Sequence, residues 1–126
     1  MMPFSEVKKQ LARMEMRVGF PTFRECHEAI EQGLVHELSP SAGRSSVREA
    51  SATLQIRMGT TRAAGKQTSG FEETIEALNS RPATETVYLY HLKGLERLYT
   101  VFVSSHDNTL LGCIRVTRDI DEGSRR

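Results

Sequence analysis

The chain has no tryptophan, only two cysteines among 126 residues, and an aromatic fraction of 6%. It also lacks an apolar run near the roughly 20 residues that a membrane-spanning helix needs. Residues 1–18 are charged throughout and have no apolar centre of the kind found in secretory signals. These absences favour a cytoplasmic protein without membrane contact, in which the thiols of Cys26 and Cys113 stay reduced and buried.

A strong charge of one sign is missing as well. The net charge is +1 at pH 7, which gives no global attraction to nucleic acid or to a membrane surface. Residues 39–70 are the exception, because five basic residues there accompany a single acidic one, Glu49. The basic residues of this segment are Arg44, Arg48, Arg57, Arg62 and Lys66.

Length and composition predict one domain over residues 1–126. The hydrophobic fraction of 38% and the charged fraction of 26% lie nearer to globular than to disordered chains. The patterns along the chain divide this domain into three parts. We expect a helical hairpin at residues 1–38, an α+β sheet unit at 39–118 and a charged tail at 119–126.

Helical spacing marks the first part of the chain. Apolar residues at i, i+4, i+7 and i+11 predict a helix over residues 5–18, ended by Gly19; they are Val7, Leu11, Met14 and Val18. A second helix is predicted from Thr22, because Thr22 and Glu25 have the spacing of a capping box. Its predicted buried stripe is Phe23, Cys26, Ala29, Ile30 and Leu34. The pattern allows this helix to end at Gly33 or to continue to about Leu38.

In the middle of the chain, the spacing of apolar residues changes from the helical repeat to the two-residue repeat of a strand. Residues 39–46 have the composition of a loop, and residues 50–58 alternate between apolar and polar side chains, which predicts an edge strand. Residues 47–50 allow a short helical turn instead. Residues 59–70, rich in glycine and hydroxyl groups, predict a mobile loop. A third helix with Phe71, Ile75 and Leu78 on its apolar face should follow, capped by Ser69.

Three β-rich runs at residues 86–92, 97–104 and 110–118 predict an antiparallel meander. The expected fold is therefore α+β, with an N-terminal αα-hairpin followed by β-α-β-β-β and a sheet of three to four strands. Because the central run is apolar on both faces, both faces should be covered. We expect helices on one face, and the αα-hairpin or a second copy of the chain on the other.

No motif for a cofactor or a metal is present. The segment 59–68 resembles a phosphate-binding P-loop only in position, because five residues separate Gly59 from Gly65 and Gln67 separates Lys66 from Thr68. The four histidines show no zinc-ligand spacing. A thiol enzyme would need Cys113 or Cys26 beside His91 or His106. We therefore predict no cofactor and no metal, and a small enzyme stays an alternative.

The sequence is best interpreted as a non-enzymatic protein-binding module, such as an inhibitor, an immunity or anti-defence protein, or an accessory factor of a bacterium or mobile element. The partner contacts predicted for it are Arg44, Arg48, Arg57, Arg62, Lys66, Tyr88, Tyr90 and Tyr99. The alternative partner is nucleic acid or phosphate, bound by the basic segment 44–66 with an affinity that falls steeply with salt. An edge strand also allows a homodimer.

Overall fold

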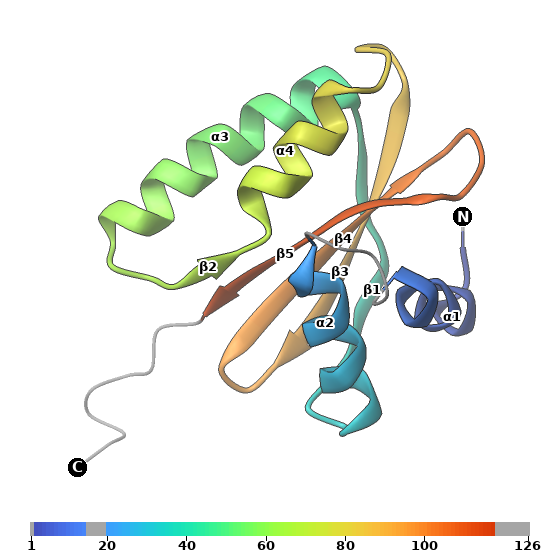
Figure 1. Cartoon of the computed structure of the whole chain (residues 1–126), viewed down its shortest axis with the longest axis vertical. Coiled ribbons are helices and arrows are strands. Elements are labelled where there is room, and N and C mark those ends of the chain that lie inside the picture. The colour runs from blue at the N-terminus through green and yellow to red at the C-terminus, as the bar shows by residue number, and fades with distance from the viewer. Residues whose placement is uncertain (1, 15–19, 118–126) are drawn as a thin grey trace.

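A five-stranded antiparallel sheet, in the order β1-β3-β4-β5-β2, organises the protein (Figure 1). The computed structural model describes residues 2–14 and 20–117. The helices are α1 (Phe4–Met14), α2 (Pro21–Glu31), α3 (Val47–Ala63) and α4 (Phe71–Asn79). The strands are β1 (Val35–Ser46), β2 (Thr68–Ser69), β3 (Thr86–Gly94), β4 (Arg97–Ser104) and β5 (Leu110–Thr117). The predicted α+β class, the N-terminal helix pair and the antiparallel sheet are confirmed.

Helices cover both faces of the sheet. Helices α1 and α2 lie on one face and α3 and α4 on the other (Figure 1). Along β3, Tyr90 and Leu92 enter the core on the α1/α2 face, whereas Val87 and Leu89 pack in the core on the α3/α4 face. This division follows from the period of two along a strand, which sends alternate side chains to opposite faces. The N-terminal helices therefore cover one face as expected, and α3 with α4 covers the other without a second copy of the chain.

Three predicted elements in the middle of the chain were wrong. Residues 39–46, predicted as a loop, belong to β1, and residues 50–58, predicted as an edge strand, lie within α3. Residues 59–63, predicted as a loop, form the last turn of α3. The edge strands are instead β1 and β2, and the pairing of β1 with β3 shifts register between Glu37 and Ser39 and between Ser39 and Gly43. Such irregularities reduce the ability of an edge to pair with another strand.

The start of α3 explains why its residues form a helix. The Ser46 hydroxyl accepts a hydrogen bond from the Glu49 amide at 3.1 Å and donates to the Glu49 carboxylate at 3.0 Å, an arrangement that satisfies a free donor of the first turn. Buried residues then recur at Ala50 and Leu54, and Met58 is partly buried. A spacing of four places them on one helical face, although the same letters also alternate as in a strand.

Tertiary contacts replaced two predicted helix caps. The N-cap of α2 is Phe20, without a side-chain cap, while the Thr22 hydroxyl contacts the Ser69 hydroxyl at 2.7 Å. The N-cap of α4 is Gly70, not Ser69. Helix α2 ends at Glu31, and Leu34, predicted to be buried, is 50% exposed. The predicted continuation of the first helix to Val18 and the tail at 119–126 lie outside the described residues.

Asn108, in the turn between β4 and β5, offers a test of the local backbone. It adopts φ 58, and its amide donates to the Ser104 carbonyl at 3.0 Å. Asn108→Ala should lower the free energy of unfolding by about 1 kcal/mol, because alanine tolerates the left-handed region poorly. Asn108→Gly should cost almost nothing. Urea denaturation of both variants measures this difference, and equal losses would contradict the assignment.

Candidate functional site

The basic residues predicted to form one contact surface lie on separate parts of the molecule. Arg44 is on β1, Arg48 in the first turn of α3, and Lys66 in the turn after α3. Arg48 and Arg62 are separated by about 21 Å along α3 at 1.5 Å per residue. Arg62 forms an ion pair with Glu72 of α4 at 2.8 Å. Arg57 is turned toward the sheet, so the basic segment does not present a single face.

The predicted tyrosine contacts serve the core beneath α1 and α2. Tyr90 and Tyr99 are 1% and 0% exposed, and Tyr88 is partly buried against the same core. The Tyr90 hydroxyl accepts from the Met2 amide at 2.7 Å. The Tyr99 hydroxyl donates to the Glu25 carboxylate at 2.5 Å. Buried Tyr90 and Tyr99 offer no surface to a partner, which is a correction to their predicted role.

Glu25 connects α2 to the central strands. Besides Tyr99, its carboxylate contacts the Arg115 guanidinium of β5 at 3.0 Å. Arg97 in turn donates to the Tyr99 hydroxyl at 3.3 Å. Burial, followed by the hydrogen bond to Glu25, raises the pKa of Tyr99 well above its usual value near 10. This cluster fixes α2 on the sheet.

The raised pKa of Tyr99 predicts a loss of stability at alkaline pH. The unfolded chain ionises this tyrosine near pH 10 and the folded chain only at a higher pH, so its stabilisation is complete below pH 10 and declines above it. The slope should reach about 1.4 kcal/mol per pH unit. Urea midpoints at pH 9 and pH 11 should therefore fall further for the wild type than for Tyr99→Phe. Equal falls would contradict the prediction.

The groups suggested for a thiol enzyme do not converge. Cys113 is buried beneath α1 and α2, whereas His91 lies on the opposite face of the sheet and His106 in the exposed turn after β4. Cys26 and Cys113 are free and buried, as predicted. Burial, together with contact with Cys26, raises the pKa of Cys113. No cluster of three or more metal-ligating side chains occurs in the part of the chain that the structure describes.

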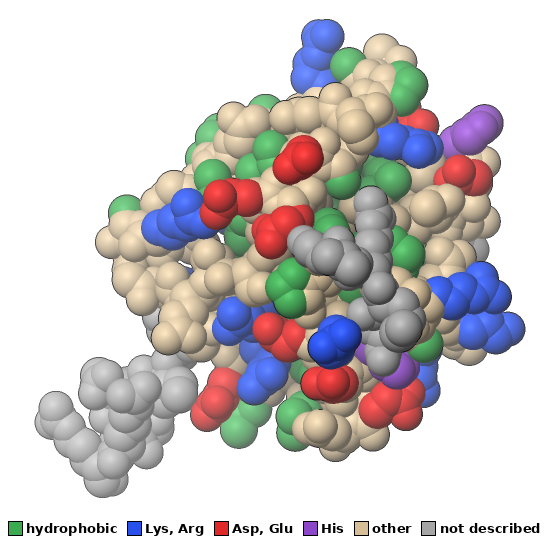
Figure 2. Space-filling view, viewed as in Figure 1, with side chains coloured by type: hydrophobic (Ala, Val, Ile, Leu, Met, Phe, Trp, Pro, Cys, Tyr) green, Lys and Arg blue, Asp and Glu red, His purple; other side chains and the backbone are tan. Residues whose placement is uncertain are grey.

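A groove runs between α3 and α4 on the outer side of the molecule. It is a hollow of about 710 Å³, with Met58 and Ile75 as its hydrophobic lining. Its other lining residues are Gln55, Glu72, Glu76, Asn79 and Ser80. A second hollow of about 320 Å³ shares Gln55 and Asn79 and extends toward Arg48 and Arg81. Figure 2 shows hydrophobic atoms between the two helices, with acidic side chains over α4.

The outer face of α3 next to this groove is uncharged. Between Glu49 and Arg62, the only charged residue of α3 is Arg57, which is partly buried. Ile56 is 72% exposed. The other exposed residues here are Ala52, Thr53, Gln55, Gly59 and Thr60. A solvent-facing helix surface usually carries charges, so the absence of charge between Glu49 and Arg62, apart from Arg57, distinguishes this face. We call Ile56, Met58, Ile75, Glu72 and Glu76 the α3/α4 surface.

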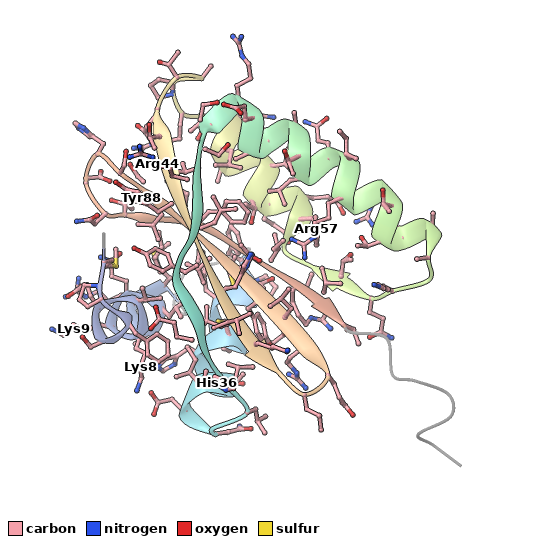
Figure 3. All side chains as sticks on the ribbon, turned by 180° about the vertical axis from the view of Figure 1, so that it is seen from behind. Lys8, Lys9, His36, Arg44, Arg57 and Tyr88 are labelled. Carbon is pink, nitrogen blue, oxygen red and sulfur yellow. The ribbon has the colours of Figure 1, made fainter. Side chains whose placement is uncertain are left out.

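The opposite side of α3 carries a polar layer against the sheet. Figure 3 shows Arg57 between α3 and the strands, apart from Arg44 on β1. Arg57 lies near His91 of β3, and its charge contributes to lowering the pKa of that imidazole after burial, which is the larger cause. His91 Nδ1 is 2.9 Å from the hydroxyl of Thr100 on β4. The packed side of α3 is therefore polar at Arg57, and the sheet beneath it is polar at His91 and Thr100. We call these three residues the polar layer.

Sequence reasoning missed the α3/α4 surface because it assigned residues 50–58 to a strand. A signal for α3 was present in the Ser46–Glu49 spacing, which is that of a capping box.

Every helix within residues 2–14 and 20–117 is too short or too polar to cross a bilayer. The chain matches no protein-family model, no curated protein and no solved structure. The α3/α4 surface and the polar layer are therefore interpreted from their own chemistry.

Proposed function

We propose that this chain is a small, non-enzymatic protein-binding module that contacts its partner through the α3/α4 surface. One observation carries the proposal: between Glu49 and Arg62 the exposed face of α3 is uncharged, presents Ile56 at 72% exposure, and borders a groove lined by Met58 and Ile75. Protein interfaces are depleted of charge at their centres and hold a few apolar anchors there. The small size of the chain fits the class of inhibitor, immunity or accessory proteins.

Burial of this surface would favour association. An isoleucine side chain that moves from water into an interface contributes about 1.5–3 kcal/mol, and Ile56 has most of that contribution still available. Ala52 and Gly59, which are small residues exposed on the same face, would allow a partner backbone to approach α3 closely. Gln55 and Asn79 offer hydrogen-bonding groups along the groove, which would orient the partner.

The borders of the groove favour a partner segment of defined chemistry. Glu72 and Glu76 line one end, and Arg48 and Arg81 line the other. Among the described residues, Arg62 compensates the charge of Glu72 across the two helices, and Glu85 compensates the charge of Arg81. From Arg48 to Met58 the helix extends about 15 Å, which matches about three turns of a bound helix. We infer a short amphipathic partner helix with basic residues facing Glu76.

Site-specific photo-crosslinking tests this proposal. A photoreactive amino acid at Ile56 should give one dominant protein adduct in extracts of the host cell. The matched control is the same amino acid at Leu95, which is 88% exposed in the turn between β3 and β4. Adducts that form equally at both positions, or that contain nucleic acid instead of protein at Ile56, would overturn the proposal.

A further inference from the structure

Arg57 occupies a position on α3 where the helix pattern calls for an apolar residue. Buried residues at Ala50, Leu54 and Thr61 have the spacing i, i+4 and i+11, and Arg57 falls at i+7 between them. A residue at this position points to the packed side of the helix. The guanidinium is accordingly half-buried between α3 and the sheet (Figure 3).

The sheet beneath Arg57 is polar at the same level. On β3 the side chains facing α3 and α4 change from Leu89, which packs in the core, to His91. On β4 they change from Phe102 to Thr100, since Leu89 pairs with Phe102 and His91 with Thr100. Thr100 is buried and holds the imidazole of His91 by the contact at 2.9 Å. The hydroxyl therefore occupies one ring nitrogen and leaves Nε2 of His91 for another partner.

Among the described residues, basic side chains surround this layer. Lys93 lies two residues along β3 on the same face, and His36 of β1 pairs with Lys93. Glu37, the neighbour of His36, pairs with Leu92 and so lies on the opposite face. Among the described residues, no carboxylate contributes to the pKa of Arg57, which burial lowers.

A half-buried guanidinium without a counter-charge is costly to keep. Partial burial removes water from a cation that has five donors to satisfy. A hydrophobic residue of similar length would pack at this position without that cost. Arg57 and His91 both keep part of their surface in solvent, so an anion can reach them from outside.

We propose that Arg57 and His91 form a binding site for an oxyanion, either a phosphate group or a carboxylate. The planar guanidinium would donate two parallel hydrogen bonds to two oxygens of the ligand. His91 would donate a third from Nε2 while Thr100 holds the ring in place. Lys93 adds favourable charge at the rim, beside its pairing partner His36. This site is independent of the α3/α4 surface, because Arg57 projects from a different side of α3.

The test uses inorganic phosphate and acetate as separate probes of the whole chain. Phosphate, acetate or both should shift the imidazole resonances of His91 in a saturable manner. The apparent affinity should fall at least about tenfold in Arg57→Gln, which corresponds to the loss of a charge-assisted hydrogen bond. The matched control, Arg44→Gln, removes an exposed arginine of β1 and should leave the affinity unchanged. Binding of phosphate alone assigns a phosphate ligand, and binding of acetate alone assigns a carboxylate.

The thermal midpoints of the wild type and of Arg57→Met test the oxyanion site independently of the NMR titration. In buffer free of oxyanions, Arg57→Met should raise the thermal midpoint, because it removes an unpaired, half-buried cation. Saturating phosphate or acetate should stabilise the wild type but not the variant, so the difference between them should shrink. No saturable binding of either anion, or equal weakening in Arg57→Gln and Arg44→Gln, would overturn the oxyanion site.

Discussion

Gly70→Ala should lower the free energy of unfolding by about 3 kcal/mol or more. Gly70 adopts φ 82 at the start of α4, where a side chain costs about 1–2 kcal/mol. A Cβ there would also lie 2.1 Å from the Cys113 carbonyl oxygen and 2.6 Å from the Thr22 hydroxyl. One of these groups is backbone, so the strands and α4 must move apart, and overpacking of this kind costs about 1–3 kcal/mol.

The control for this prediction is Gly59→Ala. Gly59 lies inside α3, and an added Cβ would meet no atom within 4 Å. Alanine should raise the helix propensity there and stabilise the protein by up to about 1 kcal/mol. Chemical denaturation of the two variants gives both values. If Gly70→Ala were as stable as the wild type, the close approach of α4 to β5 described here would be wrong.

Ile56→Asp should weaken binding of the protein partner by about a hundredfold. A carboxylate at this position would be buried without a counter-charge and would lie near the acidic border of the groove, and disruption of an interface anchor costs about 2–4 kcal/mol. A loss of about 3 kcal/mol corresponds to a factor of about a hundred in affinity. Because Ile56 is 72% exposed, the stability of the free protein should change little.

Leu95→Asp is the matched variant for Ile56→Asp. It introduces the same charge at another exposed leucine, 88% accessible in the turn between β3 and β4. Affinity for the partner captured through Ile56 should stay within about threefold of the wild type, since an exposed substitution far from the interface changes binding by less than about 1 kcal/mol. Similar losses in both variants would point to a general effect of charge rather than to the α3/α4 surface.

The sheet and the N-terminal helices could be predicted because their local patterns agree with their tertiary environment. Val87, Tyr90 and Leu92 alternate between two buried faces, and no other regular structure fits that run. The segment after Ala50 could not be assigned in this way. Its apolar residues alternate and also recur every four positions, so period alone could not separate a strand from a helix. The N-cap at Ser46 resolves the ambiguity in the structure.

The candidate sites were less accessible to prediction, because each combines residues distant in sequence. Met58 and Ile75 meet only when α3 and α4 pack together, and the charge of Arg57 acts on His91 only because α3 packs over the face of the sheet that carries His91. Arg57 was predicted as a contact residue on account of its charge, but on a strand rather than on a helix. Thr22 and Glu25 matched a capping box, yet their side chains found partners in Ser69 and Tyr99. At both Thr22 and Glu25, the side chain therefore makes a tertiary contact instead of the local capping contact that the motif predicts.

Hydrogen exchange of the chain in its partner complex tests the central claim most directly. The partner would be isolated by crosslinking through Ile56 and then added in native form to the unmodified chain. Amides within α3 and α4 should exchange more slowly in the complex, chiefly at residues 51–58 and 72–80, while β1 should be unaffected. Protection confined to β1 or to α2, with unchanged exchange in α3 and α4, would contradict the claim that the α3/α4 surface is the contact.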